Sequence, residues 1–216
     1  MNWDWSAVAD FMPRFADGLL VTLQVLVLGS LIAFSLGLVW AAGLRSHSRL
    51  VRWPVTAATE FVRTTPLLVQ LFFLYFVLPE AGVRFSAFTT GVVAIGLHYS
   101  TYTAQVYRAG IDAVPAGQWE AATALSLPAH RTWFAVILPQ ALRRVAPALG
   151  NYVVAMLKDT PLLAAIGVLE MLQQARLESA GTFQYTEPLT VVGVAFVLVA
   201  YPASLLVRAL ERRLVH

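Results

Sequence analysis

The sequence predicts an all-α polytopic membrane protein. Of its 216 residues, 58% are hydrophobic and only 12% are charged, about half the charged fraction of an ordinary soluble domain. The mean hydropathy is +0.68, and the apolar residues gather in runs long enough for membrane-spanning helices. A soluble protein of this size needs more polar surface, so the composition excludes that class.

Five apolar segments are candidate spans, because a bilayer core of ~30 Å requires about 20 helical residues. They cover about 19–44, 66–78 (starting further back, near residue 60), 88–106, 145–157 and 189–207. A further apolar stretch, 162–172, is about half a span long and suits a re-entrant or interfacial helix. Residues 1–18 contain Trp3 and Trp5 and indicate a separate extracytoplasmic segment on the membrane surface.

The basic residues are unevenly distributed between the spans. Most of them follow the first, third and fifth spans: Arg45, Arg49, Arg52, Arg63, Arg108, Arg131, Arg143, Arg144, Arg208, Arg212 and Arg213. Because positive residues accumulate on the cytoplasmic side, we expect the N-terminus outside and the C-terminus inside. This orientation requires an odd number of spans, which five transmembrane helices satisfy.

The segment 107–147, between the third and fourth spans, is long for a membrane connection, and long loops are often functional. Prolines divide it into helical pieces, one ending before Pro128 and a second ending at Pro139. In the first piece Trp119 and Ala122 share a face with Leu125 or Ser126. Such a helix either docks on another protein or packs on its own bundle, and the spacing favours neither.

Several motifs occur in an order that matches a known family. "GLLVTLQVLVLGSLIAFSLGLVWA" starts at Gly18, "EFVRTTPLLVQLFFLYFVLP" at Glu60, "EAATALSLPAHRTWFAVILPQALRR" at Glu120 and "LKDTPL" at Leu157. Together they resemble the permeases of ATP-binding cassette (ABC) importers for polar amino acids, such as histidine, glutamine, glutamate, arginine and opines. The sequence departs from the family at Ser126 and Thr64, where glycine is usual.

The resemblance implies a type I ABC importer permease, with a transmembrane domain over 19–216 and a cytoplasmic coupling loop at about 107–147. The loop would seat in an ABC ATPase, through Gly117, Trp119, Glu120, Ala121, Ala122, Ser126, Pro128, Ile137 and Pro139. The other implied partners are an extracytoplasmic substrate-binding protein and a second permease, either a copy or a paralogue. ATP and Mg would belong to the ATPase dimer, because this chain lacks a phosphate-binding loop motif and is not itself an enzyme.

The implied function is uptake of polar amino acids, or of compatible solutes such as ectoine, across the bacterial inner membrane. An ion-gradient-driven secondary transporter or channel is the alternative. It would require repeated halves with matching broken helices, and the sequence shows no internal repeat. The sequence has no cysteine, and His98 has no partner at metal-ligand spacing, so no metal site is expected.

Two opposite charges, Lys158 and Asp159, interrupt an apolar stretch where lipid disfavours them. Adjacent helical residues point about 100° apart, and Pro161 is expected to break the helix beside them. The two side chains either contact a zwitterionic substrate or tie the fourth span to the half-span that follows. The candidate substrate path comprises Lys158, Asp159, Thr160, His98, Tyr99 and Tyr102. Glu60 and Arg63 are expected to form an i,i+3 salt bridge at the cytoplasmic end of the second span.

Overall fold

The computed structural model describes residues 3–214, and every regular element in that range is helical. The α-helices are α1 (Trp5–Leu44), α2 (Arg49–Thr64), α3 (Leu67–Phe72), α4 (Ala87–Asp112), α5 (Ala116–Ala124), α6 (Ala129–Arg131), α7 (Leu138–Asp159), α8 (Met171–Thr182) and α9 (Thr186–Leu214). Between them lie π-helical turns at Phe73–Val77 and Thr132–Ile137 and 3₁₀ turns at Leu78–Ala81 and Thr160–Ile166.

The long helices fit a polytopic membrane protein. Within the described residues, α1 and α9 are each long and apolar enough to cross a membrane. Two bent pairs also qualify: α2 with the segment Leu67–Ala81, bent by 103°, and Ala129–Ile166 with α8, bent by 46°. The 26-residue helix α4 is long enough to cross, but polar residues in its middle lower its hydropathy.

The first helix begins well before residue 19, where the first span is predicted to begin. Trp5 through Leu44 form one continuous helix of 40 residues, so the predicted leading segment is helical from Trp5 onward and continuous with the span. The Asp4 side chain caps this helix by accepting a hydrogen bond of 2.8 Å from the Ser6 backbone N–H. Residues 1–2 of the predicted leading segment lie outside the described range.

Helix α4 packs along α1 more extensively than any other pair of elements. Small residues allow the close approach, as is common between helices in membranes. A Cβ on Gly96 would lie 2.6 Å from the Ile32 Cβ, and one on Gly37 would overlap the Thr103 hydroxyl. That hydroxyl donates a hydrogen bond of 2.7 Å to the Ala33 carbonyl. The crossing therefore depends on glycine.

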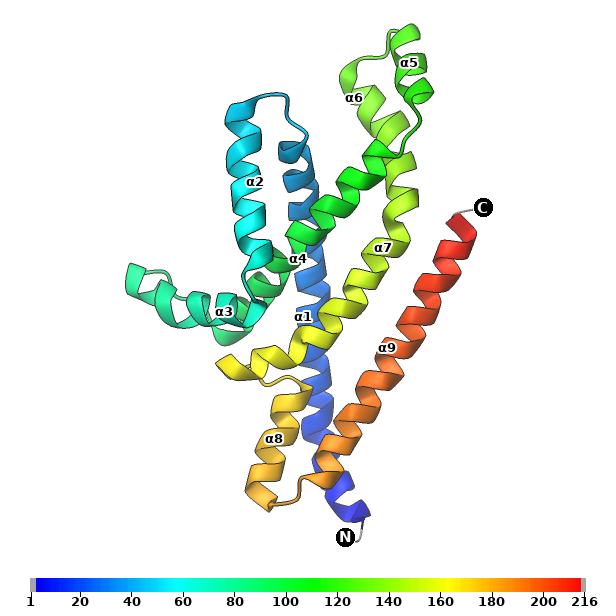
Figure 1. The fold of residues 1–216 in the computed structure, drawn as a ribbon. Helices are drawn as coiled ribbons and strands as arrows, with labels where there is room; N and C mark the ends of the chain where they lie inside the picture. Colours follow the sequence, from blue (N-terminus) through cyan, green and yellow to red (C-terminus); the bar gives the residue numbers. More distant parts are fainter. Residues whose placement is uncertain (1–2, 215–216) are drawn as a thin grey trace.

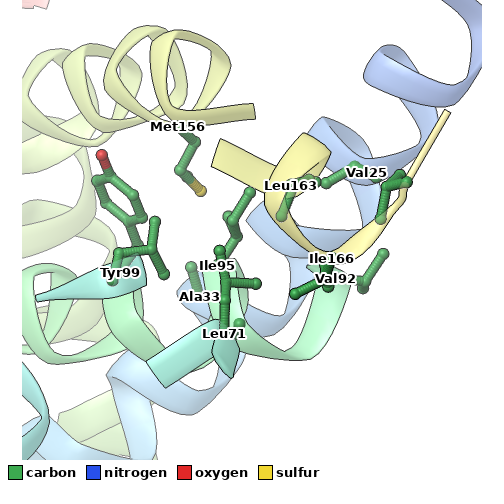
Figure 2. Packing of buried hydrophobic residues seen from close by; sticks show 12 residues of the cluster. Val25, Ala33, Leu71, Val92, Ile95, Tyr99, Met156, Leu163 and Ile166 are labelled. Atoms are coloured by element: carbon green, nitrogen blue, oxygen red, sulfur yellow. The ribbon is translucent and has the colours of Figure 1, made fainter. Parts of the chain in front are cut away.

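The main hydrophobic core lies where α1, α3, α4, α7 and the 3₁₀ turn after α7 meet (Figure 2). Ile95 of α4 and Leu71 of α3 are fully buried within it, as are Met156 of α7 and Leu163 of the turn. Burying a side chain of this size contributes about 1.5–3 kcal/mol. The core fixes α4 and α7 against each other at the depth where α7 ends.

Proline and glycine divide two apolar stretches into separate helices. Within the second predicted span, α2 ends at Thr64 and Pro66 precedes α3. Likewise, 162–172 is not one helix. A 3₁₀ turn ends at Ile166, Gly167 follows with φ of +80°, and α8 begins at Met171. Glycine adopts this left-handed conformation without steric cost.

The predicted helix stop at Pro139 is also wrong. Helical structure runs from Ala129 to Ile166, and Pro139 lies at the start of α7, directly after the π-helical turn Thr132–Ile137. A π-helical turn inserts an extra residue. This relieves the clash between a proline ring and the preceding turn, which would otherwise break the helix.

The termini lie at opposite ends of the helical array (Figure 1). Helices α5 and α6 project beyond the ends of α4 and α7 on the side of the C-terminus, whereas α8 lies toward the N-terminus. Helix α9 runs beside α7, and a Cβ on Gly150 of α7 would lie 2.7 Å from the Val207 side chain of α9. The predicted loop 107–147 is thus mostly helix, with irregular backbone only around α5.

Candidate functional site

The first candidate site is α5, which stands at one extremity of the molecule (Figure 1). The edge-to-face pair Trp119 and Trp133, whose ring centroids are 5.2 Å apart, attaches it to the π-helical turn before α7. The Gln140 side-chain amide donates a hydrogen bond of 3.1 Å to the Gln118 side-chain oxygen. Movement of α5 must therefore act on the start of α7.

The C-terminus of α5 closes in a Schellman motif. Ser126 adopts a left-handed conformation with φ of 51°, and its N–H donates 2.9 Å to the Thr123 carbonyl. The Leu127 N–H donates 3.0 Å to the Ala122 carbonyl. Glycine is the usual residue at this position of the motif, so serine carries a conformational strain here. Pro128 follows directly and prevents the helix from continuing.

The two faces of α5 are in different environments. Ala122 is 2% exposed and Trp119 is half-buried, so the face that the sequence analysis singled out packs inward. Leu125 does not belong to that face, because it is 72% exposed. The outward face instead presents further residues of the predicted coupling set, namely Gly117, Glu120, Ala121, Ser126 and Pro128. Of the two remaining members, Ile137 is fully buried and Pro139 is half-buried, so they support α5 from within.

The second candidate site is a cluster of aromatic rings between α4 and α7. His98, Tyr99 and Tyr102 come from consecutive turns of α4, and Tyr152 comes from α7. The Tyr99 and Tyr102 rings each lie about 6 Å from the Tyr152 ring, and the His98 ring lies 5.2 Å from the Tyr102 ring. The cluster combines π faces, which attract cations, with polar groups that can hydrogen-bond a ligand.

Asp159 lies beside these rings at the last position of α7. The Tyr99 hydroxyl donates a hydrogen bond of 2.7 Å to its Oδ2, and Figure 2 shows that hydroxyl directed toward the helix that carries Met156. A carboxylate at a helix C-terminus is disfavoured by the helix dipole. Within residues 3–214 no cationic side chain lies within ion-pair distance of Asp159. The site thus holds a half-buried negative charge that a cation would stabilise.

Lys158 does not join Asp159. Its side chain is exposed on a different face of α7, which also carries exposed Asn151 and Arg144 at intervals of seven residues. Positions seven apart stay on nearly the same helix face. A lysine on a spanning helix must face protein or an aqueous cavity rather than lipid. Thr160, also predicted for the path, is fully buried and donates 2.8 Å to the Leu157 carbonyl.

Glu60 and Arg63 form an ion pair, with Arg63 Nη2 2.6 Å from Glu60 Oε2. This confirms the predicted i,i+3 ion pair, whereas its place at the cytoplasmic end of the second span stays a prediction. The pair lies at the break between α2 and α3, where the Arg63 carbonyl accepts a hydrogen bond of 3.2 Å from the Tyr102 hydroxyl. Because α2 begins at Arg49, Arg63 lies roughly 20 Å further along the helix axis.

Two further residues adjoin the cluster, Tyr152 and Gln70, and sequence reasoning missed the first of them. Tyr152 lies two helical turns before Asp159 and so shares its face; that spacing is the signal that was available. The Gln70 amide donates 2.6 Å to the Val62 carbonyl and 2.9 Å to the Thr65 carbonyl, and it lies 3.1 Å from His98 Nδ1. It therefore joins the α2–α3 break to the aromatic cluster.

Comparison with known proteins agrees with this architecture. A probable amino-acid ABC transporter permease protein, y4tG, of Sinorhizobium fredii is 46% identical over 97% of this chain and 91% of its own length. The glutamine transport system permease protein GlnP of Escherichia coli is 35% identical over 99% of both chains. A crystal structure of an amino acid ABC transporter with histidines covers 99% of this chain and 100% of its own, with a TM-score of 0.89 and 34% identity.

Residues 33–216 match the family described as "binding-protein-dependent transport system inner membrane component". The match begins within α1 and includes α5, the aromatic cluster and Asp159. A membrane component of this family works with a separate binding protein, which decides against the ion-gradient alternative. The chain belongs to the binding-protein-dependent transport system inner membrane components.

Proposed function

We propose that this chain is the permease subunit of an ATP-driven importer for polar amino acids or related zwitterionic compatible solutes. Relatives named for glutamine and arginine transport, 35% and 33% identical, support the substrate class. The single observation that carries the proposal is the uncompensated carboxylate of Asp159 among aromatic rings. Such a site attracts the ammonium group that every α-amino acid carries.

In the proposed site the ammonium group of the substrate lies at Asp159, which the Tyr99 hydroxyl orients. The rings of His98, Tyr102 and Tyr152 surround the same point. Lys158 points away from Asp159, so it does not bind the carboxylate of a substrate held at that position. We place Lys158 instead on a continuation of the substrate path along the exposed face of α7, which a second permease, a copy or a paralogue, would close.

The proposed topology has five spans, with the N-terminus outside and the C-terminus in the cytoplasm. The spans are α1, the bent pair α2–α3, α4, α7 with the bent segment that follows, and α9. The opposite positions of the termini support this order (Figure 1). The transmembrane domain then covers 19–216, and α1 extends from the membrane through the external residues 3–18.

The outward face of α5 is the proposed contact with the ATPase dimer. Glu120 and Ala121 are exposed on it, and nothing else in the described chain covers them. Replacing Glu120 with lysine should abolish uptake while leaving the amount of permease in the membrane unchanged. Uptake at the parent rate in this variant would refute the proposed contact between α5 and the ATPase.

Replacement of Asp159 with asparagine tests the substrate site. In proteoliposomes containing the partner subunits, uptake of labelled arginine, glutamine, histidine or ectoine should fall at least about tenfold, because an ion pair removed from a buried site costs about 2–5 kcal/mol. Asp10→Asn is the matched control, since Asp10 is exposed on the external part of α1. Unchanged uptake in the Asp159 variant would show that this carboxylate does not bind the substrate and has a structural role.

A further inference from the structure

A cavity of about 630 Å³ opens where the end of α1 approaches α5 and the start of α7. Its volume falls within the range of small-molecule binding sites. The α1 wall changes character along the helix: Leu38, Ala41 and Ala42 are apolar, and Arg45 with His47 lies at the end. The cavity is thus amphipathic along the α1 axis, with an apolar end toward the membrane interior and a basic end at the C-terminus of α1.

The opposite wall is aromatic. Trp119, Trp133 and Phe134 line it, and Phe134 is 73% exposed. Tryptophan is enriched where a membrane meets water, because its ring is apolar and its N–H is polar. This wall therefore suits the boundary between the headgroup and the acyl chain of a lipid.

The basic end carries an excess of positive charge. Arg45 forms an ion pair with Asp112, and Arg108 Nε lies 3.9 Å from the other oxygen of the same carboxylate. Partial burial, and then repulsion from Arg108, lower the pKa of the Arg45 guanidinium. The single carboxylate of Asp112 thus neutralises only one of the two arginines, and His47 lines the same end of the cavity. An additional anion would stabilise this arrangement.

We propose that this cavity binds one anionic phospholipid, with its phosphate at Arg45 and His47 and its acyl chain along Leu38 and the tryptophan wall. The site is distinct from the substrate path, and it depends on the proposed function only for its assignment to the cytoplasmic leaflet. A soluble phosphate would satisfy the basic end and leave the apolar wall uncovered. The lipid also touches α5 and the start of α7, the two elements through which the coupling movement is proposed to pass.

Native mass spectrometry of the purified full chain, with the subunits that co-purify, tests the proposal. The complex is equilibrated with equal amounts of phosphatidylglycerol and phosphatidylcholine in detergent, and retained lipid is counted. The parent chain should retain phosphatidylglycerol preferentially, and Arg45→Gln should lower this retention about fivefold, the effect of one basic residue at an anionic surface. Arg84→Gln, a charge-matched change of an exposed arginine outside the cavity, should leave it unchanged.

Because Arg45 also pairs with Asp112, a second variant separates lipid binding from local structure. Ala42→Trp fills the apolar end of the cavity without removing a charge and should lower retention at least as much. Val39→Trp is its control, since Val39 is 62% exposed on α1 and does not line the cavity. Three results would overturn the proposal. The two tryptophan variants could retain equal amounts of phosphatidylglycerol, the parent chain could retain both lipids equally, or soluble glycerol phosphate could displace the bound lipid. Substrate uptake is not the readout, so failure here leaves the transport proposal standing.

Discussion

Replacing Ser126 with glycine should stabilise α5. The left-handed conformation at φ of 51° costs a non-glycine residue about 1–2 kcal/mol. Glycine avoids this cost but loses about 0.5–1 kcal/mol through the greater freedom of the unfolded chain. The difference leaves a net gain of about 0.5–1 kcal/mol, which corresponds to a two- to fivefold change in a local opening equilibrium.

Hydrogen exchange measured by mass spectrometry on peptides from 114–128 provides the assay. Amides of unchanged residues in α5 should exchange two- to fivefold more slowly in Ser126→Gly. Ala121→Gly is the matched control: it places the same residue in the exposed middle of α5, where glycine costs about 1 kcal/mol. Exchange there should become about fivefold faster. Exchange in Ser126→Gly that is as fast as in the parent would show that the Schellman geometry does not govern the stability of α5.

Three further outcomes are expected. Gly37→Val should lower the thermal unfolding midpoint, because overpacking costs about 1–3 kcal/mol. Gly193→Ala is the control and should leave the midpoint unchanged, because its added Cβ meets nothing within 4 Å. Equal midpoints in the two variants would refute the close approach of α1 and α4. Glu170→Ala should speed amide exchange in the first turn of α8. Both carboxylate oxygens of Glu170 accept backbone N–H groups there, at 2.8 and 2.7 Å, and such caps contribute about 1 kcal/mol. Unchanged exchange would exclude the cap. Tyr99→Phe should raise the KM for uptake by about tenfold, because a hydrogen bond to a charged group contributes about 1.5–3 kcal/mol, and an unchanged KM would mean that Asp159 is oriented by other groups.

The long helices were predictable from the sequence because apolar runs long enough to cross a bilayer appear directly in the hydropathy. Helices α1, α7 and α9 lie where apolar runs predict them. Their ends were less accurate, since hydropathy does not register a change of direction. The break at Pro66 was signalled by "TTP", yet the apolar residues on both sides concealed a bend of 103°. Conversely, Pro139 signalled a stop that the π-helical turn before it removes.

The candidate sites were predictable in part, and the limit is again geometric. The sequence predicted that the adjacent residues Lys158 and Asp159 point about 100° apart, but not which neighbours each side chain would meet. The partners of Asp159 are distant in sequence: Tyr99 comes from α4, and the chain gives no local sign that the two meet. Tyr152 looks like one more aromatic residue of a buried face until α4 supplies the neighbouring rings.

The two candidate sites are joined by one structural element. Helical structure is continuous from Ala129 to Ile166, so the turn on which α5 rests and the carboxylate of Asp159 belong to the same rod. From Trp133 to Asp159 the rod is roughly 40 Å long at 1.5 Å per residue. A small rotation at the α5 end therefore reaches Asp159 without passing through a flexible loop. The same rotation would shift Asp159 relative to Tyr99, because a hydrogen bond between their side chains is what joins the two residues. In the proposed mechanism, a change at α5 thus alters the affinity of Asp159 for the substrate ammonium group, and ATP-driven transport requires a coupling of this kind.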